Sequence, residues 1–589
     1  MHVERLTNRE VLDPDAELAI HIEVPEVEEG EPKKINVKDR CNCITREENV
    51  ENLGTIAQSG AREFLKHIDD EEFDASEVIG QFGVGFYSAF MVADEIEVIS
   101  RSYDPAATAV SWTSDGSDNF QIEDAEKADR GTEVHLTLKN DAEEFASEWK
   151  LKQIVKKYSD FVRYPIYVGD EQANQQTSLW RQPPPAVSEE DKNQFYQQMT
   201  MDFEEPLLNI HFSSDAPVHL RSLLFVPAKR EAGILALRKE PGQMLYSHNV
   251  LIQEYINDLL PDWLNFVDGV VDSEDIPLNV SRETVQSTRI MRQLGRTLRK
   301  RVLRELSTLA EKEPEKYEQF WQEYGRTFKE GMATDPAASE EILPFLRYLS
   351  SKSDGQLISL DEYVERMAEN QEEIYYVLGD DEKSVARSPH LDPFKARGLE
   401  VLYWIDPLDA YLAPLLPEYK EKKLRNIDDA SLELPQAADE AETEAAAPLL
   451  DEAPFNQFIG RCVTTLGERV VEVRESKVLK DSPVRLVSPP DAADRDYQRL
   501  QRFFDENYEV PKKILEINRS NPLIINLAQM LHAQPDSELV DTAIEQLYES
   551  ALVQEGLHPN PAQMLPRIEQ LMLLATEAAN LENGFDEEE

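Results

Sequence analysis

The sequence is poor in cysteine and in long apolar runs. It holds 3 cysteines among 589 residues, too few for a disulfide framework, which favours a reducing compartment. No run of about 18 uninterrupted apolar residues, as a membrane-spanning helix needs, occurs in it. Residues 1–30 also lack the apolar core of a secretory signal. We therefore expect a cytoplasmic protein that does not act at a membrane.

Basic residues are scarce relative to acidic ones. Lys and Arg number 61 and Asp and Glu 115, so the formal net charge is −54. So acidic a surface repels phosphate backbones and anionic lipids, which argues against nucleic acid or a membrane as partner. Hydrophobic residues still make up 41% of the chain, enough for several packed cores. At about 150 residues per domain, the length predicts three or four domains.

The alternation of strands and helices predicts an α/β (α+β) multidomain protein with domains at 1–170, 186–430 and 450–589. Helical spacing is present at 47–67, and the acidic, low-complexity stretch 436–448 is typical of a linker. Strands are expected at 18–24, 34–38, 95–102, 109–114, 132–138, 219–226, 373–377, 470–474 and 484–487, and a helix at 289–309.

The last domain is predicted to be mainly helical, with two apolar stripes at i, i+3, i+4, i+7 spacing. Either the stripes pack within their own subunit, or they form a helix-bundle interface between two copies of the chain. The stripes are Ile544, Leu547, Tyr548 and Ala551, and Ile568, Leu571, Met572 and Ala575.

A glycine-rich turn, Gly80-Gln-Phe-Gly83-Val-Gly85-Phe86, comes immediately before an apolar segment expected to be a helix. Glycines let the backbone approach a ligand, and the amides at a helix N-terminus favour phosphate oxygens. A tight contact between helix and sheet would need the same residues. The motif alone therefore leaves phosphate binding and plain packing equally open.

The neighbouring motifs resolve this ambiguity. Asp39 at a strand end, Leu53-Gly-Thr-Ile-Ala-Gln-Ser-Gly60, the glycine turn and Arg130-Gly-Thr-Glu133 follow one another in an order that resembles the heat-shock protein 90 chaperones, bacterial HtpG type. These belong to the gyrase–histidine-kinase ATPase superfamily. The resemblance runs from about residue 5 to 580 and includes Leu223-Leu-Phe-Val-Pro227. It implies an N-terminal two-layer α/β sandwich, an α/β middle domain and a mainly helical C-terminal dimerisation domain.

The resemblance also implies a site for ATP in the first domain. Asp39 matches the family's carboxylate that accepts a hydrogen bond from the adenine amino group, a donor that guanine does not present at that position. Thr132 matches the residue that supports this contact. The other matched pocket residues are Asn52 on the ribose and phosphate side, Gly83 and Gly85 near the phosphates, and Phe86 at the pocket floor.

For catalysis, Arg282 and Gln286 match the middle-domain residues that reach the γ-phosphate when the domains dock. The guanidinium group suits the charge on a transferring phosphoryl group. With Mg²⁺ as the companion ion of ATP, the family works as a homodimeric clamp on partly folded client proteins. Residues considered for client contact, with core packing as the alternative, are Trp321, Tyr324, Met564 and Leu565.

The sequence departs from the family in two places. The helix carrying the family's water-orienting Glu and magnesium-ligating Asn has no counterpart in residues 1–30, which suggests a truncated N-terminus. The family's Asp-Asn-Gly-x-Gly-Met-Thr motif is Asp39-Arg-Cys-Asn-Cys-Ile-Thr45, with cysteines at both glycine positions, and Gln58 replaces a common Lys. A Cys-x-Cys pair without further ligands nearby does not predict a metal site.

Three functions follow from these observations. The first is an ATP-dependent chaperone. The second is a nucleotide-independent holdase or a catalytically inactive, truncated chaperone, because the departures predict weak ATP hydrolysis or none. The third, a DNA-handling ATPase of the same superfamily, is disfavoured by the acidic charge.

Overall fold

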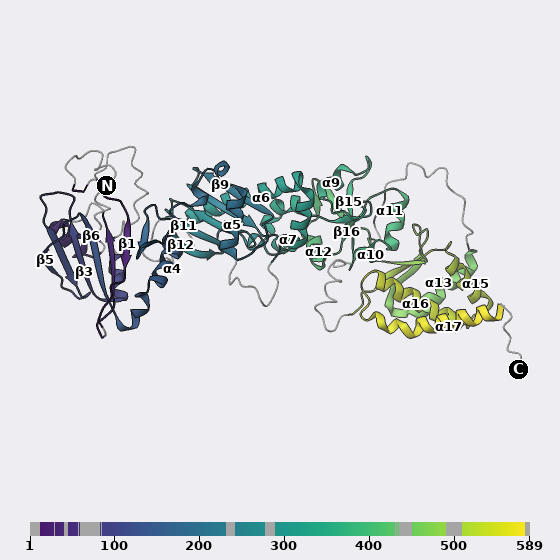
Figure 1. Cartoon of the computed structure of the whole chain (residues 1–589). Helices are drawn as coiled ribbons and strands as arrows, with labels where there is room; N and C mark the ends of the chain where they lie inside the picture. Colours follow the sequence, from purple (N-terminus) through teal and green to yellow (C-terminus); the bar gives the residue numbers. More distant parts are fainter. Residues whose placement is uncertain are drawn as a thin grey trace. The chain divides into compact units, whose positions relative to one another are not determined.

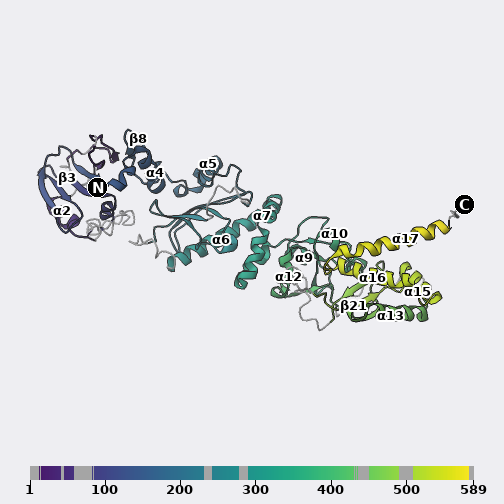
Figure 2. The same ribbon diagram turned by 90° about the horizontal axis from the view of Figure 1, so that it is seen from below.

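The computed structural model describes residues 12–13, 15–28, 30–40, 45–56, 58, 83, 85–230, 242–276, 289–429, 432, 434, 450–489 and 509–582. Two compact units make up the chain, Met1–Tyr317 and Glu318–Glu589, each with its own sheets and cores (Figure 1 and Figure 2). Within the described ranges, no helix is long and apolar enough to cross a bilayer.

The first unit begins with an eight-stranded sheet in the order β5-β4-β3-β6-β2-β1-β7-β8. Neighbouring strands are antiparallel except β1 and β7, which are parallel. The strands are β1 Ile20–Glu23, β2 Lys34–Asp39, β3 Ala93–Arg101, β4 Ala109–Ser114, β5 Gln121–Ala125, β6 Gly131–Leu138, β7 Ile166–Val168 and β8 Glu171–Gln172. The helical segments beside them are α2 Arg46–Leu53, η2 Phe86–Met91, η3 Asn140–Phe145 and α4 Glu148–Ser159.

The two faces of this sheet differ in polarity because side chains alternate along each strand. One face is apolar and packs against Leu53 of α2, Phe86 of η2 and Leu151 of α4. The other face carries ion pairs such as Lys38 Nζ to Glu23 Oε2 at 2.8 Å. The apolar face is therefore the one that the helices cover.

The strands predicted in this part are present within two residues at either end, but two helix predictions are wrong in part. The helix predicted at 47–67 ends at Leu53, where Gly54 caps it by donating to the Val50 carbonyl; residues 57 and 59–67 of that prediction lie outside the described residues. The apolar segment after the glycine turn forms only the short 3₁₀ helix η2. Strand β3 already begins at Ala93, so the segment is too short for a longer helix.

The first unit also contains a five-stranded sheet in the order β12-β11-β13-β10-β9. Helix α6 lies against it, since the Arg301 guanidinium stacks over the Phe212 ring at 5.3 Å. The elements are α5 Glu189–Thr200, β9 Leu208–Ser214, β10 Leu220–Val226, β11 Gln243–Ser247, β12 Val250–Ile256, β13 Asp268–Asp272 and α6 Arg289–Lys312. The predicted strand at 219–226 and helix at 289–309 are thus confirmed.

The second unit begins with a five-stranded sheet in the order β14-β16-β15-β18-β17. Strand β15, at its centre, is parallel to both neighbours. The strands are β14 Leu349–Ser350, β15 Glu373–Leu378, β16 Leu402–Trp404, β17 Glu418–Tyr419 and β18 Lys422–Asn426. The helices of this region are α7 Pro314–Thr334, which begins in the first unit, α8 Ser339–Ile342, α9 Leu360–Glu365, α10 Glu382–Val385, α11 Asp392–Ala396 and α12 Pro407–Leu412.

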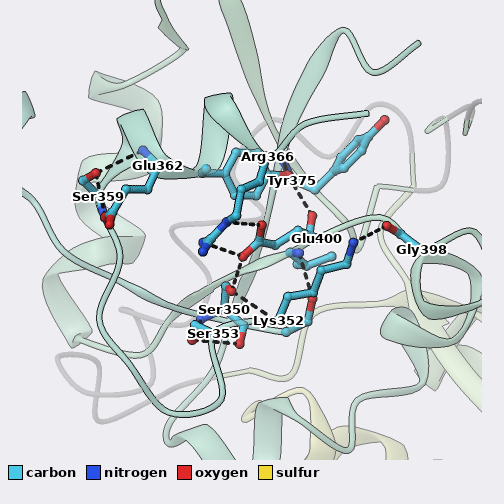
Figure 3. A network of polar contacts seen from close by, with 12 residues as sticks. Ser350, Lys352, Ser353, Ser359, Glu362, Arg366, Tyr375, Gly398 and Glu400 are labelled. Atoms are coloured by element: carbon cyan, nitrogen blue, oxygen red, sulfur yellow. Dashed lines mark hydrogen bonds and ion pairs between the residues drawn. The ribbon is translucent and has the colours of Figure 1, made fainter. Parts of the chain in front are cut away.

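A buried carboxylate joins the elements around this sheet (Figure 3). Glu400, 4% exposed, accepts hydrogen bonds from the Arg366 guanidinium at 3.0 and 3.2 Å and from the Ser350 hydroxyl. The Tyr363 hydroxyl donates to the Glu400 carbonyl at 2.7 Å and accepts from the Tyr375 amide at 3.0 Å. The network satisfies polar groups that would otherwise be costly to bury.

The C-terminal part of the second unit packs three helices and a three-stranded sheet around one core, to which the last helix contributes no residue. The central strand, β21, was not predicted from the sequence; it lies between the two strands that were. The elements are α13 Glu452–Leu466, β19 Val470–Glu475, β20 Val484–Val487, β21 Lys513–Ile517, α15 Pro522–Ala533, α16 Glu538–Gln554 and α17 Leu565–Glu582.

The two apolar stripes of this region have different environments. Ile544 and Tyr548 on α16 are buried in the core of their own subunit. On α17, Met572 is 63% exposed and Leu565 57%. The first stripe thus packs internally, whereas α17 presents apolar side chains to solvent. Of the residues considered for client contact, three are buried and only Leu565 is exposed: Trp321, Tyr324 and Met564 are the buried ones.

Candidate nucleotide site

Asp39 and Thr132 lie opposite each other on neighbouring strands. Asp39 is the last residue of β2 and pairs in register with Thr132 of β6. Asp39 follows Ile35 and Val37 at two-residue spacing, and both of these pack in the apolar core. By this alternation, Asp39 and Thr132 share the helix-covered face, at the end where its apolar residues give way to polar ones.

Strands β2 and β6 approach each other closely beside this pair. Gly131 has φ +136°, and a Cβ there would lie 2.2 Å from the Asp39 carbonyl oxygen. Only glycine is compatible with that approach. The preceding residue, Arg130, is 1% exposed, and its guanidinium nitrogens have no partner among the described residues. The sequence indicated Arg130 only as part of a motif, and its burial was not predicted, because burial of a cation leaves no signal in a single sequence.

Asn52 is held over the covered face by a locally specified helix. Helix α2 begins with a capping box, in which the Glu48 amide donates to Thr45 Oγ1 at 3.2 Å and the Thr45 amide to the Glu48 carboxylate at 2.7 Å. Leu53 anchors the other end in the core. Asn52 Oδ1 is buried with no hydrogen-bond partner in the described structure. Such an atom is costly unless a ligand supplies a donor.

The two matched glycines of the turn have different requirements. Gly83 has φ +64°, and a Cβ there would lie 1.9 Å from the Gln58 carbonyl oxygen. Gly85 has φ −59°, and a Cβ there would meet nothing within 4 Å. The backbone conformation and the contact with Gln58 therefore require glycine at position 83, whereas the space beside Gly85 is open.

Phe86 follows the turn and packs in the apolar core. Its ring meets the Trp112 ring edge-on, with centroids 5.7 Å apart. The adjacent Tyr87 hydroxyl donates to the Leu53 carbonyl at 2.5 Å, and burial raises the pKa of this tyrosine. These contacts join η2 to α2, so the glycine turn and Asn52 are held by one packed assembly.

The two residues proposed for catalysis are not among the described residues. Arg282 and Gln286 lie outside the described residues, as do Cys41 and Cys43. Among the residues that the structure does describe, no group of three or more His, Cys, Asp or Glu side chains is arranged to hold a metal ion.

The comparison with protein families connects this arrangement to known proteins. The family described as "Hsp90 protein" matches residues 168–589, which is most of the chain. The chain belongs to the Hsp90 family.

Curated relatives extend the match through the candidate site. A protein of Desulfitobacterium hafniense named "Chaperone protein HtpG" is 41% identical over 95% of this chain and 90% of its own length. Proteins of the same name from Chlorobium chlorochromatii and Oleidesulfovibrio alaskensis are 37% and 38% identical, over 97% and 96% of this chain and 90% and 89% of their own lengths.

Two expectations are decided by these matches. The multidomain α+β fold class is confirmed as that of the Hsp90 family. The truncation expected from the sequence is not supported, because the alignments cover about nine-tenths of each relative. The domain boundaries at 170, 186, 430 and 450 stay predictions.

Proposed function

We propose that this chain is an ATP-dependent molecular chaperone that binds partly folded client proteins. The observation that carries the nucleotide part is the in-register pair of Asp39 and Thr132 at the polar end of the covered face. The chaperone part is supported by relatives named chaperones that align over nearly the whole chain. A cytoplasmic location remains a prediction.

The residues present fit an adenine nucleotide. Asp39 has a carboxylate that accepts the adenine amino hydrogen, and Thr132 on the facing strand has a hydroxyl within the same row of side chains. Asn52 Oδ1, buried and without a partner in the described part, needs a donor such as a ribose hydroxyl. The open space beside Gly85 leaves room for a phosphate near the backbone.

Hydrolysis is proposed on the family match. Arg282 would stabilise the charge of the γ-phosphate, and Gln286, four residues further along the chain, would contact the same group. Bound ATP with Mg²⁺ supplies the phosphoryl group that is transferred to water. The second candidate, a nucleotide-independent holdase, is favoured by the cysteines at positions 41 and 43, where the family has glycine.

We also propose that the chain works as a homodimer. The exposed apolar side chains of α17, including Leu565, Met572 and Leu573, would be covered by the same helix of a second copy. Exposed apolar surface of this kind is stabilised by burial at an interface.

The test of nucleotide binding is calorimetric titration of ATP with magnesium into the full chain and into Asp39→Asn. Loss of a hydrogen bond to a charged acceptor costs about 1.5–3 kcal/mol, so affinity should fall roughly 10- to 100-fold. Asp118→Asn, the same change at an exposed loop residue, is the matched control. Equal affinities for the two variants would contradict the assigned site.

Hydrolysis and chaperone activity are then measured separately. An ATP-dependent chaperone hydrolyses ATP in a manner abolished by Arg282→Ala and releases a thermally unfolded client on addition of ATP. A holdase suppresses client aggregation equally with and without ATP. Failure to suppress aggregation under either condition would refute both.

A further inference from the structure

A cavity of about 430 Å³ lies in the second unit, apart from the nucleotide site. Segments distant in sequence form it: α11, the end of β18, and strands β19, β20 and β21 of the C-terminal sheet. Its volume is in the range of small-molecule sites. Its lining residues are Pro393, Phe394, Arg397, Ile427, Asp429, Leu432, Leu434, Arg474, Glu475, Lys477, Val478, Arg485 and Glu516.

The lining combines an apolar wall with a surplus of cations. Phe394 and Ile427 are both 2% exposed, so the wall is built into the core of the unit. Four of the lining residues are Lys or Arg and three are Asp or Glu. The cations of the lining thus outnumber its anions, although the formal net charge of the chain is −54.

Each carboxylate of the lining already has a cation. Asp429 pairs with Arg425 at 3.2 Å, an arginine outside the lining. Glu475 lies 3.8 Å from Arg519, which is also outside it. Each of these two carboxylates thus has an ion-pair partner outside the lining.

The third carboxylate, Glu516, is held by two arginines at once. Arg474 Nη2 lies 2.7 Å from Oε1 and Arg485 Nη2 lies 2.8 Å from Oε2, while the Ser476 hydroxyl donates to Oε2 at 3.1 Å. Arg474 Nη1 also lies 4.0 Å from Glu472 Oε2, so the two guanidinium groups are balanced by two carboxylates. Each guanidinium has five N–H donors, more than Glu516 can accept.

Lys477 adds a further positive charge. It lines the cavity, is exposed, and forms no ion pair with any described residue. An exposed ammonium, the guanidinium groups beside Glu516 and an apolar wall together suit an anion attached to an apolar group.

We propose that this cavity is a binding site for small amphipathic organic anions, such as aryl carboxylates or sulfonates. The apolar ring lies against Phe394, Ile427 and Val478, and the anionic group faces Lys477 and the arginine pair. Binding there requires no nucleotide and uses none of the residues proposed for ATP.

The test uses 1-anilinonaphthalene-8-sulfonate as the anionic probe and N-phenyl-1-naphthylamine as a neutral probe of similar shape. Fluorescence titrations are made on the full chain without ATP, on Lys477→Glu, and on Lys480→Glu as the matched control. Lys480 is an exposed lysine three residues further on that does not line the cavity. Lys477→Glu should weaken binding of the sulfonate about fivefold and leave the neutral probe unchanged.

Two further measurements test whether the probes bind in this cavity. Val478→Asp places a carboxylate against the apolar wall and should weaken both probes; Leu434→Asp replaces it if that variant does not fold. Raising the salt concentration should weaken only the sulfonate, because exposed charge interactions are screened. Equal sulfonate affinity in Lys477→Glu and Lys480→Glu, or unchanged binding of both probes in the wall variant, would overturn the proposal.

Discussion

The glycine turn allows a sharp test, because its two matched glycines have opposite structural requirements. An alanine at position 83 must adopt φ +64°, which costs an L-residue about 1–2 kcal/mol. Its Cβ would also lie 1.9 Å from the Gln58 carbonyl oxygen, so the Gln58 backbone must move. An alanine at position 85 keeps φ −59° and ψ −38°, ordinary values for any residue, and meets no atom within 4 Å.

The assay is amide hydrogen exchange on the full chain, followed in peptides that cover 45–58. A local cost of 1–2 kcal/mol corresponds to about 5- to 30-fold faster exchange of α2 in Gly83→Ala. Gly85→Ala should exchange like the unsubstituted protein. Unchanged exchange in Gly83→Ala would refute the argument that this turn is fixed against Gln58.

The same pair of variants separates packing from ligand binding. If the backbone at Gly85 approaches the phosphates of ATP, Gly85→Ala weakens ATP affinity although its exchange is normal. An ATP affinity equal to that of the unsubstituted chain would show that Gly85 has no part in binding the nucleotide.

Three further predictions concern the second unit. In sedimentation velocity, Met572→Glu should convert the proposed dimer to monomer while Gln570→Glu does not; dimers in both variants would refute the proposed α17 interface. Tyr363→Phe leaves the buried Tyr375 amide without its acceptor and should lower the free energy of unfolding in urea by about 1–3 kcal/mol, whereas no change would mean the network adds nothing. Burial raises the pKa of Glu516, but Arg485 and Arg474 lower it more, so the pKa of Glu516 is below its ordinary value. The ionised Glu516 therefore stabilises the folded protein above about pH 4.5, and this stabilisation is lost as the pH falls through the folded pKa. Glu516→Gln should therefore be destabilised at pH 7 and approach the unsubstituted protein on acidification; a difference that is constant with pH would contradict this.

The features that the sequence determined by itself depend on residues close together in the chain. Alternation of apolar and polar residues located the strands of the first sheet, since period two follows from strand geometry whatever the partner. The capping box of Thr45 and Glu48 starts α2 through bonds three residues apart. The motifs around Asp39 were sufficient to identify the family, because residue order along the chain needs no structure.

Tertiary structure decided which of these segments meet. The register that places Asp39 opposite Thr132 joins residues far apart in the chain and depends on the packing of the whole sheet. Strand β21 lies at the centre of its sheet, and its five residues are all buried, so it has no alternation to reveal it. The cations around Glu516 likewise come from separate strands. Such contacts depend on how the whole domain packs, and no local pattern in the sequence predicts them.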